Sequence, residues 1–295
     1  MPMSDGLPFP VTITRVVQES PNVTTIYFDH AFSSKHGQFV MVWAPGIDEI
    51  PMALSYPDAI TVQRVGDATT ALVTKKPGEG IGIRGPFGNG FVIRGKTLAI
   101  AGGVGAAPLL RIGLEYPDVT FLLGARTAEE LIFYDTLSSA CDVRVATDDG
   151  STGYHGYVAG LLNEINMDEY ETIVVCGPDP MMRSVLKVLE GRNALDKSQF
   201  SMHRYMKCGV GLCGSCCVDP DGVCVCKDGP VFAYDKIKNI KDIKVSSAPT
   251  INIKGLRGLI FTITATQKLI KTIKKENIDI IHAHYIIPPG LIALL

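Results

Sequence analysis

Six of the eight cysteines lie within nineteen positions, in the glycine-rich stretch KCGVGLCGSCCVDPDGVCVCKDGPVF. Three of them, Cys208, Cys213 and Cys216, have the spacing C-x4-C-x2-C, which is typical of plant-type [2Fe–2S] sites. Such a site needs a fourth thiolate further along the chain, and Cys224 and Cys226 are both candidates. The stretch therefore predicts an iron–sulfur cluster, whose chemistry is electron transfer.

The glycines between these thiols are part of the prediction. Gly209, Gly211 and Gly214 allow the left-handed backbone of a tight ligand loop and leave N–H groups open to sulfur. A four-cysteine zinc site usually has two short cysteine pairs well apart, which the x4 gap does not resemble. Structural disulfides are uncommon in cytosolic proteins. We interpret the remaining thiols, Cys141, Cys176 and Cys217, as packed side chains.

A turn suited to a dinucleotide precedes the cysteine stretch. The motif GGVGAAP follows a predicted strand, and Gly102, Gly103 and Gly105 would let the backbone approach a pyrophosphate. The motif departs from G-x-G-x-x-G at Pro108, so a plain tight turn is the alternative.

A second turn, CGPDPMM, follows a later strand and contains Cys176, Gly177 and Pro178. The carboxyl ends of parallel strands meet at one edge, where doubly wound sheets bind their ligands. We therefore expect both turns to bind a pyridine nucleotide. Arg126 stands where a ribose-binding carboxylate would be expected, which leaves the choice between NAD and NADP open.

The elements that position these motifs change character at Lys96. Upstream, alternating and β-branched segments predict an antiparallel barrel with strands at 11–17, 23–28, 38–43, 60–65 and 71–75 and a last strand from residue 80. Downstream, strands alternate with helices, which implies a parallel, doubly wound sheet. Its predicted strands are 97–101, 119–123, 143–147 and 172–176, and its helices are a segment ending at 114, 128–140, 157–165 and 180–190.

Composition excludes several other classes of protein. With 46% hydrophobic residues, 20% charged residues and a net charge of −2, the chain can bury real cores and shows no charge bias towards nucleic acid. The N-terminus lacks the charged and apolar regions of a secretory signal, and no stretch of about 18 apolar residues predicts a membrane span. We expect a cytoplasmic protein with no nucleic-acid or membrane partner.

The order of the motifs resembles the ferredoxin–NADP reductase superfamily and, within it, the electron transfer subunits of class 1B dihydroorotate dehydrogenases. The resemblance covers about residues 8–240 and is carried by RYMKCGVGLCGSC, VCKDGPVF and GPFGNGF. It implies Cys226 as the fourth cluster ligand beside Cys208, Cys213 and Cys216, with Cys224 spare. The implied domains are an FAD-binding β-barrel (1–95), a pyridine-nucleotide-binding α/β domain (96–200), a [2Fe–2S] cluster segment (201–240), and a linker with a tail (241–295).

The flavin motif of the resembled family, Arg-Pro-x-Ser, falls here on Ile50–Ala53, so its arginine and its serine are both absent. Ser55 and the backbone of the preceding residues are expected to contact the flavin instead. For Arg64, a solvated strand arginine is the alternative. The candidate FAD-binding residues are Pro51, Met52, Ala53, Leu54, Ser55, Val62, Gln63, Arg64, Thr69 and Thr70.

The resemblance implies a redox subunit that does not itself oxidise dihydroorotate. An FMN-containing catalytic subunit would pass electrons through the [2Fe–2S] cluster and FAD to NAD+, in pyrimidine (UMP) biosynthesis and in a heterotetramer with two copies of each subunit. No nucleophile or acid–base constellation stands out, so we predict no catalytic residues. The alternatives are a reductase subunit of a hydrogenase, sulfite reductase or transhydrogenase complex, and a zinc-stabilised binding module.

The resemblance ends near Ser247. The tail that follows predicts a strand, an amphipathic helix, a second strand and an apolar helix start, and about 40 of its residues resemble a fragment of a GT-B glycosyltransferase. No sugar-transfer site can be complete in so short a fragment. His282 and His284 are an alternative metal-binding pair within it. We expect the tail to be a fusion remnant or a gene-model artefact, loosely attached, that the cofactor sites do not need.

Overall fold

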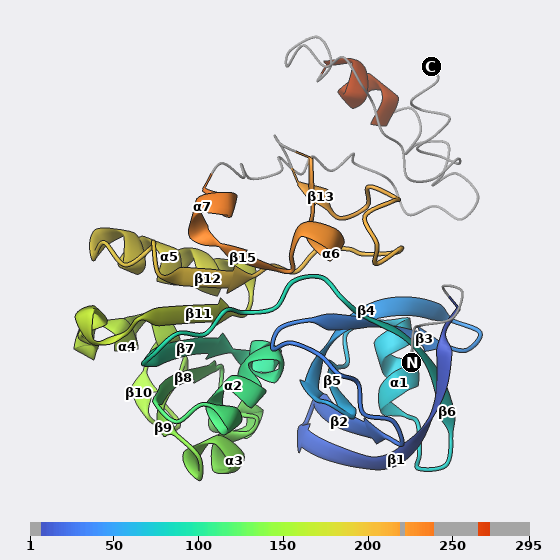
Figure 1. Ribbon diagram of the computed structural model, residues 1–295, viewed down its shortest axis with the longest axis horizontal. Coiled ribbons are helices and arrows are strands. Elements are labelled where there is room, and N and C mark those ends of the chain that lie inside the picture. The colour runs from blue at the N-terminus through green and yellow to red at the C-terminus, as the bar shows by residue number, and fades with distance from the viewer. Residues whose placement is uncertain (1–6, 219–221, 239–264, 272–295) are drawn as a thin grey trace. The chain divides into compact units, whose positions relative to one another are not determined.

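The computed structural model describes residues 7–218, 222–238 and 265–271. The chain divides into two compact units, residues 1–240 and 241–295, and each is described by itself. The first unit contains a barrel, drawn in blue and cyan in Figure 1, and a parallel sheet with its helices, drawn mainly in green and yellow.

The barrel has six strands: β1 (Phe9–Ser20), β2 (Val23–Phe28), β3 (Phe39–Ala44), β4 (Asp48–Tyr56), β5 (Ala59–Gln63) and β6 (Gly80–Phe87). They close in the order β1-β2-β5-β4-β3-β6, and all paired neighbours are antiparallel. Ile13, Ile26, Val40, Ile60 and Ile83 are buried in the interior, as alternation along each strand requires. The predicted antiparallel barrel is confirmed.

The strand predicted at 71–75 is wrong, because helix α1 (Asp67–Val73) occupies most of these residues. The Thr69 hydroxyl accepts hydrogen bonds from the N–H groups of Val65 and Gly66, both at 2.9 Å, and so satisfies donors at the helix start. Leu72 is fully buried in the barrel core. Capping and burial outweigh the β-branched composition that suggested a strand.

The second sheet has seven strands: β7 (Thr97–Gly102), β8 (Val119–Ala125), β9 (Asp142–Thr147), β10 (Tyr154–His155), β11 (Thr172–Cys176), β12 (Ser198–Ser201) and β15 (Val231–Ala233). Their order is β10-β9-β8-β7-β11-β12-β15, and every pair except the last is parallel. The central strands β7 and β11 are buried on both faces, as parallel strands usually are. The predicted doubly wound sheet is confirmed.

Short helices cover the two faces of this sheet. The segments η1 (Gly103–Leu109), α2 (Leu110–Glu115) and α3 (Tyr134–Ser138) share one core cluster, and α4 (Val158–Leu161) and α5 (Asp179–Gly191) share the other. The predicted helix at 128–140 is shorter than expected: η2 (Ala128–Glu130) is separated from α3, and Phe133 between them has φ 61°. The remaining short segments are η3 (Leu162–Glu164), η4 (Met167–Glu169), α6 (Val225–Asp228) and α7 (Tyr234–Ile237).

The cysteine-rich segment is built into the parallel sheet. It contains a two-stranded hairpin, β13 (Cys217–Val218) and β14 (Val223–Cys224), and it continues into β15. Strand β15 pairs antiparallel with β12, with Phe232 opposite Phe200. Both phenylalanines are buried, so apolar packing and backbone hydrogen bonds join the segment to the sheet.

In the second unit, the structure describes a helix over residues 265–271, inside the predicted amphipathic helix. The other predictions for the tail, including His282 and His284, fall outside the described residues. Among the helices that are described, none has the length and apolar character of a membrane span.

Candidate functional site

The cysteine loop folds around glycines in the left-handed region, as predicted. Gly209, Gly211 and Gly214 have φ values of 74°, 78° and 73°, which residues with a Cβ rarely adopt. A Cβ on Gly211 would lie 2.7 Å from the side chain of Lys227, and one on Gly209 would lie 3.1 Å from Met41. Glycine is therefore required here both by the turn and by close packing.

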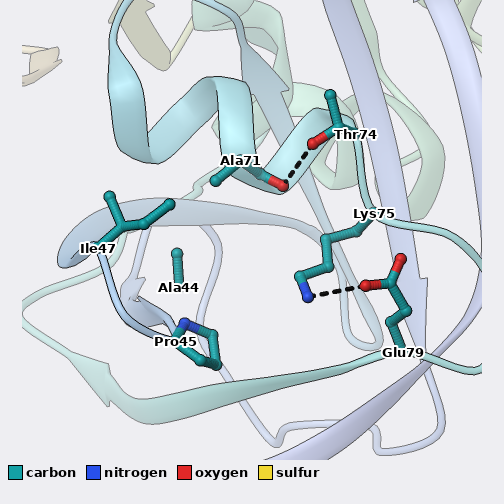
Figure 2. Close-up of a pocket in the computed structure, with 7 residues that line it drawn as sticks. All are labelled: Ala44, Pro45, Ile47, Ala71, Thr74, Lys75 and Glu79. Atoms are coloured by element: carbon teal, nitrogen blue, oxygen red, sulfur yellow. Dashed lines mark hydrogen bonds and ion pairs between the residues drawn. The ribbon is translucent and has the colours of Figure 1, made fainter.

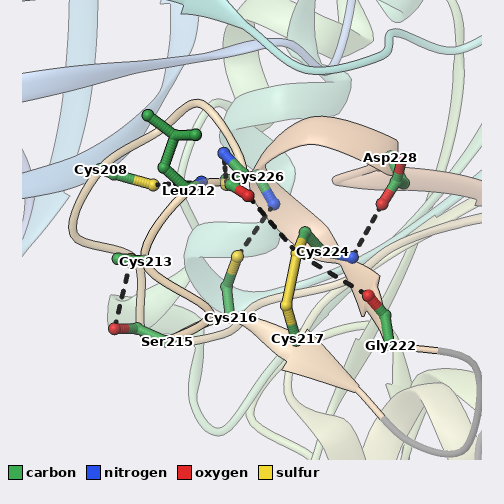
Figure 3. The surroundings of a disulfide bond; sticks show 11 residues. Cys208, Leu212, Cys213, Ser215, Cys216, Cys217, Gly222, Cys224, Cys226 and Asp228 are labelled. Carbon is green, nitrogen blue, oxygen red and sulfur yellow. Dashed lines mark hydrogen bonds between the residues drawn. A yellow bond between two sulfur atoms is a disulfide. The ribbon is translucent and has the colours of Figure 1, made fainter. Parts of the chain in front are cut away.

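Backbone N–H groups in this loop donate to three of the four predicted ligand sulfurs. The N–H of Leu212 donates to the Cys208 sulfur at 3.3 Å, that of Gly211 to the Cys226 sulfur at 3.1 Å, and that of Cys226 to the Cys216 sulfur at 3.3 Å (Figure 3). The Cys213 thiol donates to the Ser215 hydroxyl at 3.3 Å. Such N–H donors stabilise thiolates that hold a cluster, so the loop fits the group that the spacing predicts.

The surroundings of two thiols in the loop shift their pKa values in opposite directions. Burial alone would raise the pKa of Cys208, but hydrogen bonds from the backbone of Cys213, Val210 and Leu212 lower it to about 6. Burial and the neighbouring Cys216 raise the pKa of Cys226 to about 12. Within the described residues, no three His, Cys, Asp or Glu side chains enclose a single metal ion. The fit to a cluster rests on the loop and its N–H donors rather than on a closed coordination shell.

Cys217 and Cys224 form a disulfide across the β13–β14 hairpin (Figure 3). The two residues are register partners with their Cα atoms 4.0 Å apart, so the hairpin brings their sulfurs together. The interpretation of Cys217 as a packed free thiol is therefore wrong. The bridge also engages Cys224, whereas Cys226 is buried in one cluster with Cys216 and Cys208.

One ion pair and one set of hydrogen bonds to the backbone tie the cysteine loop to the barrel. The Arg84 guanidinium donates to both carboxylate oxygens of Glu49 at 2.7 Å, and it also reaches the carbonyl oxygen of Cys208 at 3.3 and 3.4 Å. The Lys207 ammonium pairs with the Asp48 carboxylate at 2.6 and 2.7 Å. Hydrogen bonds to Lys207 and to the backbone hold the pKa of Asp48 below its usual value. Sequence reasoning missed these residues. The signal that could have found them is the presence of charged side chains close to the strands that flank the motifs.

Two of the quoted motifs lie against each other. In GPFGNGF, the Asn89 backbone N–H donates to the Gly229 carbonyl at 2.5 Å, and its side-chain amide donates to the Asp228 carbonyl at 2.8 Å. Gly229 belongs to VCKDGPVF, and a Cβ on Gly88 would clash with Pro230. The turn that leaves the barrel is therefore fixed against the end of the cysteine loop.

The two predicted nucleotide turns meet at the carboxyl edge of the parallel sheet. Strands β7 and β11 are neighbours, with Cys176 opposite Ala101. A Cβ on Gly105 would lie 2.7 Å from the carbonyl carbon of Cys176, and a Cβ on Gly177 would lie 3.1 Å from the N atom of Gly102. Gly103 has φ 53°, and no atom would lie within 4 Å of a Cβ there. Half-exposed Gly103 and exposed Pro178 leave this edge open.

The structure places the predicted flavin residues in two groups. Pro51, Met52 and Ala53 are half-buried on β4, which contacts η1 of the first nucleotide turn. Ser55 is fully buried; its hydroxyl donates to the Ala59 carbonyl at 3.3 Å and accepts from Thr61 at 2.9 Å. Leu54 is buried on β4. Val62 (buried) and Gln63 (half-buried) lie on β5, exposed Arg64 directly follows it, and Thr69 (buried) and Thr70 (exposed) lie on α1.

Two hollows lie at one end of the barrel. One, of about 410 Å³, is lined by Ile47, Asp48, Ile50 and residues 65–69, and it contains Thr69 of the predicted flavin set. The other, of about 200 Å³, is shown in Figure 2, with the Lys75–Glu79 ion pair of 2.9 Å at its side. The second hollow contains none of the predicted site residues.

At the end of β8, the guanidinium of Arg126 donates to both carboxylate oxygens of Glu130, at 2.8 and 2.6 Å. Glu130 supplies a carboxylate that sequence reasoning did not connect with this position, because it is four residues further along the chain. Its hydrogen bonds raise the pKa of Arg126.

A closed antiparallel barrel followed by a parallel sheet and an iron–sulfur segment defines a ferredoxin reductase-like redox protein. The solved structure of an NADH-dependent reduced ferredoxin–NADP oxidoreductase, described for flavin-based electron bifurcation, is 27% identical with a TM-score of 0.64 and covers 80% of this chain and 90% of that one. Residues 203–238 match the iron–sulfur cluster binding domain of dihydroorotate dehydrogenase B.

Curated relatives make the assignment more specific. A probable dihydroorotate dehydrogenase B (NAD(+)) electron transfer subunit from Methanocella arvoryzae is 49% identical over 76% of this chain and 90% of the relative. One of the same name from Methanocaldococcus jannaschii is 44% identical over 78% of this chain and 91% of the relative. The chain belongs to the family of dihydroorotate dehydrogenase B electron transfer subunits. Residues 221–295 also match a glycosyl transferase 4-like family, in line with the likeness of the tail.

Proposed function

We propose that this chain transfers electrons from a dihydroorotate-oxidising partner subunit to NAD+, within pyrimidine biosynthesis. The observation that carries the proposal is the cysteine loop: the sulfurs of Cys208, Cys216 and Cys226, three of the four predicted ligands, receive backbone N–H bonds in a segment that matches the cluster-binding domain of this family. A [2Fe–2S] cluster supplies single-electron transfer when bound, and FAD supplies exchange between single electrons and a hydride.

The residues of this chain would bind and orient these groups. Cys208, Cys213, Cys216 and Cys226 would hold the cluster, and the half-buried backbone of β4 would lie along the flavin. The glycine turns at the ends of β7 and β11 would receive the pyridine nucleotide, because their backbones approach each other without side chains between them. Contact between β4 and η1 brings the proposed flavin and nucleotide sites together.

The assembly that we propose contains two copies of this chain and two of the partner, in the cytoplasm. We also propose that the chain has four functional divisions: residues 1–95, 96–200, 201–240 and 241–295. The cluster segment would lie near the partner, since the cysteine loop carries Leu212, whose side chain is 85% exposed.

Cofactor analysis of the anaerobically purified chain tests the proposal first. We expect a flavin and iron–sulfur visible spectrum, with roughly two irons, two acid-labile sulfides and one FAD per chain. Zinc without flavin would contradict it. The second test is to mix the chain with a purified FMN-containing dihydroorotate-oxidising subunit. We expect reduction of NAD+ by dihydroorotate only when both proteins are present.

A further inference from the structure

The Arg84 guanidinium lies between the barrel and the cysteine loop. Its side chain leaves β6 and is only 13% exposed, and that of its partner Glu49 on β4 is 22% exposed. The two N–H···O bonds of 2.7 Å form a bidentate pair, which is a geometrically specific arrangement. The same guanidinium donates to the backbone carbonyl of Cys208. One side chain thus connects the wall of the barrel to the first predicted cluster ligand.

A second contact fixes the same point of the loop. Lys207, which precedes Cys208, pairs with Asp48, which precedes Glu49. Two successive loop residues are therefore held by β4 and β6, and β4 is also the strand of the proposed flavin contacts. Gly209 continues the contact by packing on Met41 and Phe87.

We propose that Arg84 is a positioning residue that holds the cluster loop against β4, and that its charge, balanced by Glu49, sets the reduction potential of the cluster. The inference rests on the proposed function, because it concerns the group that the loop would hold. It adds a role for two residues that are not ligands.

The sign of the effect follows from electrostatics. Reduction adds one negative charge to the cluster, so a nearby cation favours the reduced form and raises the potential, and a nearby anion lowers it. Arg84 and Glu49 are mostly shielded from water, so neither charge is fully screened. Removing Arg84 leaves Glu49 unbalanced and should lower the potential. Removing the charge of Glu49 leaves Arg84 unbalanced and should raise it.

The test is the midpoint potential of the cluster in the full-length, cofactor-loaded chain, measured by anaerobic titration with electron paramagnetic resonance detection. Arg84→Gln should lower the potential and Glu49→Gln should raise it. Each shift should be about tenfold in the ratio of reduced to oxidised cluster at a fixed potential, or ~59 mV for one electron. The double variant should return towards the wild type, and Arg84→Lys, which keeps the charge, should stay close to it.

The outcomes separate this inference from the proposed function. A wild-type chain without a cluster signal would refute the proposed function. A wild-type signal with equal potentials in Arg84→Gln and Glu49→Gln, or with shifts of the same sign, would overturn the inference. If Arg84→Gln takes up no cluster, the variants Glu49→Gln and Arg84→Lys decide. A raised potential in Glu49→Gln together with an unchanged potential in Arg84→Lys would support the role of charge. Any other pattern would overturn the inference.

Discussion

Cys224 and Cys226 are only two positions apart, yet the hairpin gives them different surroundings. The first is bridged to Cys217, and the second accepts the Gly211 N–H and lies beside Cys216. From the sequence alone both were candidates, since spacing does not show which way each side chain points from a strand end. The register of β13 and β14 is the information that the sequence lacked.

Serine substitutions at these two positions should have opposite results. We expect Cys226→Ser to lose the cluster, because a hydroxyl replaces a thiolate ligand, and Cys224→Ser to retain it. Iron content and visible absorbance after anaerobic purification measure both. Retention by Cys226→Ser with loss by Cys224→Ser would reverse the assignment.

The thiol of Cys141 offers a test of burial away from the cluster. Burial, with a smaller effect of the Asp142 carboxylate, raises the pKa of Cys141 from 9.0 to about 11. The contribution of this protonated thiol to the stability of the folded state is therefore fully present below pH 9 and is lost as the pH rises through about 11.

At pH 8 we expect Cys141 to be alkylated about 100-fold more slowly in the folded chain than in urea, because the thiolate is the reactive form. Quenched labelling with peptide mass spectrometry gives both rates, and Cys141→Ala identifies the peptide. Equal rates would show that the thiol is not shielded.

At the scale of elements, the close approach of the two nucleotide turns depends on the absence of a side chain at Gly105. Gly105→Ala would push a methyl group into the backbone of Cys176 and Gly177, so the turns would have to separate. We expect a loss of stability of about 1–3 kcal/mol and a weaker affinity for NADH.

The matched control is Gly191→Ala, at the end of α5, where a Cβ would meet no atom within 4 Å. Chemical denaturation and NADH titration of both variants provide the comparison. If Gly105→Ala behaves like the control, the close approach of the turns does not matter for the site.

Much of the element pattern was predictable, and the exceptions have local causes. Strand 172–176 was predicted with its observed bounds, because a buried parallel strand is a short apolar run ended by a turn. Helix α1 was missed, since its capping depends on the hydroxyl of Thr69 rather than on periodicity. The Arg84–Glu49 pair was also not predictable, because it joins residues 35 positions apart across β3.

For the whole molecule, the first 240 residues form one compact unit and account for all proposed cofactor ligands. We therefore expect a chain without residues 248–295 to retain its flavin and its cluster. Cofactor content per chain and the thermal unfolding midpoint, compared with the full-length protein, test this. Loss of both cofactors on truncation would show that the tail contributes to the sites.

Strand β15 has a consequence for solubility. It is only three residues long, and it caps the side of β12 that β11 does not cover. An uncovered strand presents a row of unpaired N–H and C=O groups that can recruit another chain, and a short terminal strand is one way in which proteins avoid such aggregation. Because β15 directly follows the cysteine loop, damage to the loop by oxidation would also loosen this protective cover. We therefore expect a chain that has lost its cluster to self-associate more than the cluster-loaded chain, which size-exclusion chromatography of the two would measure.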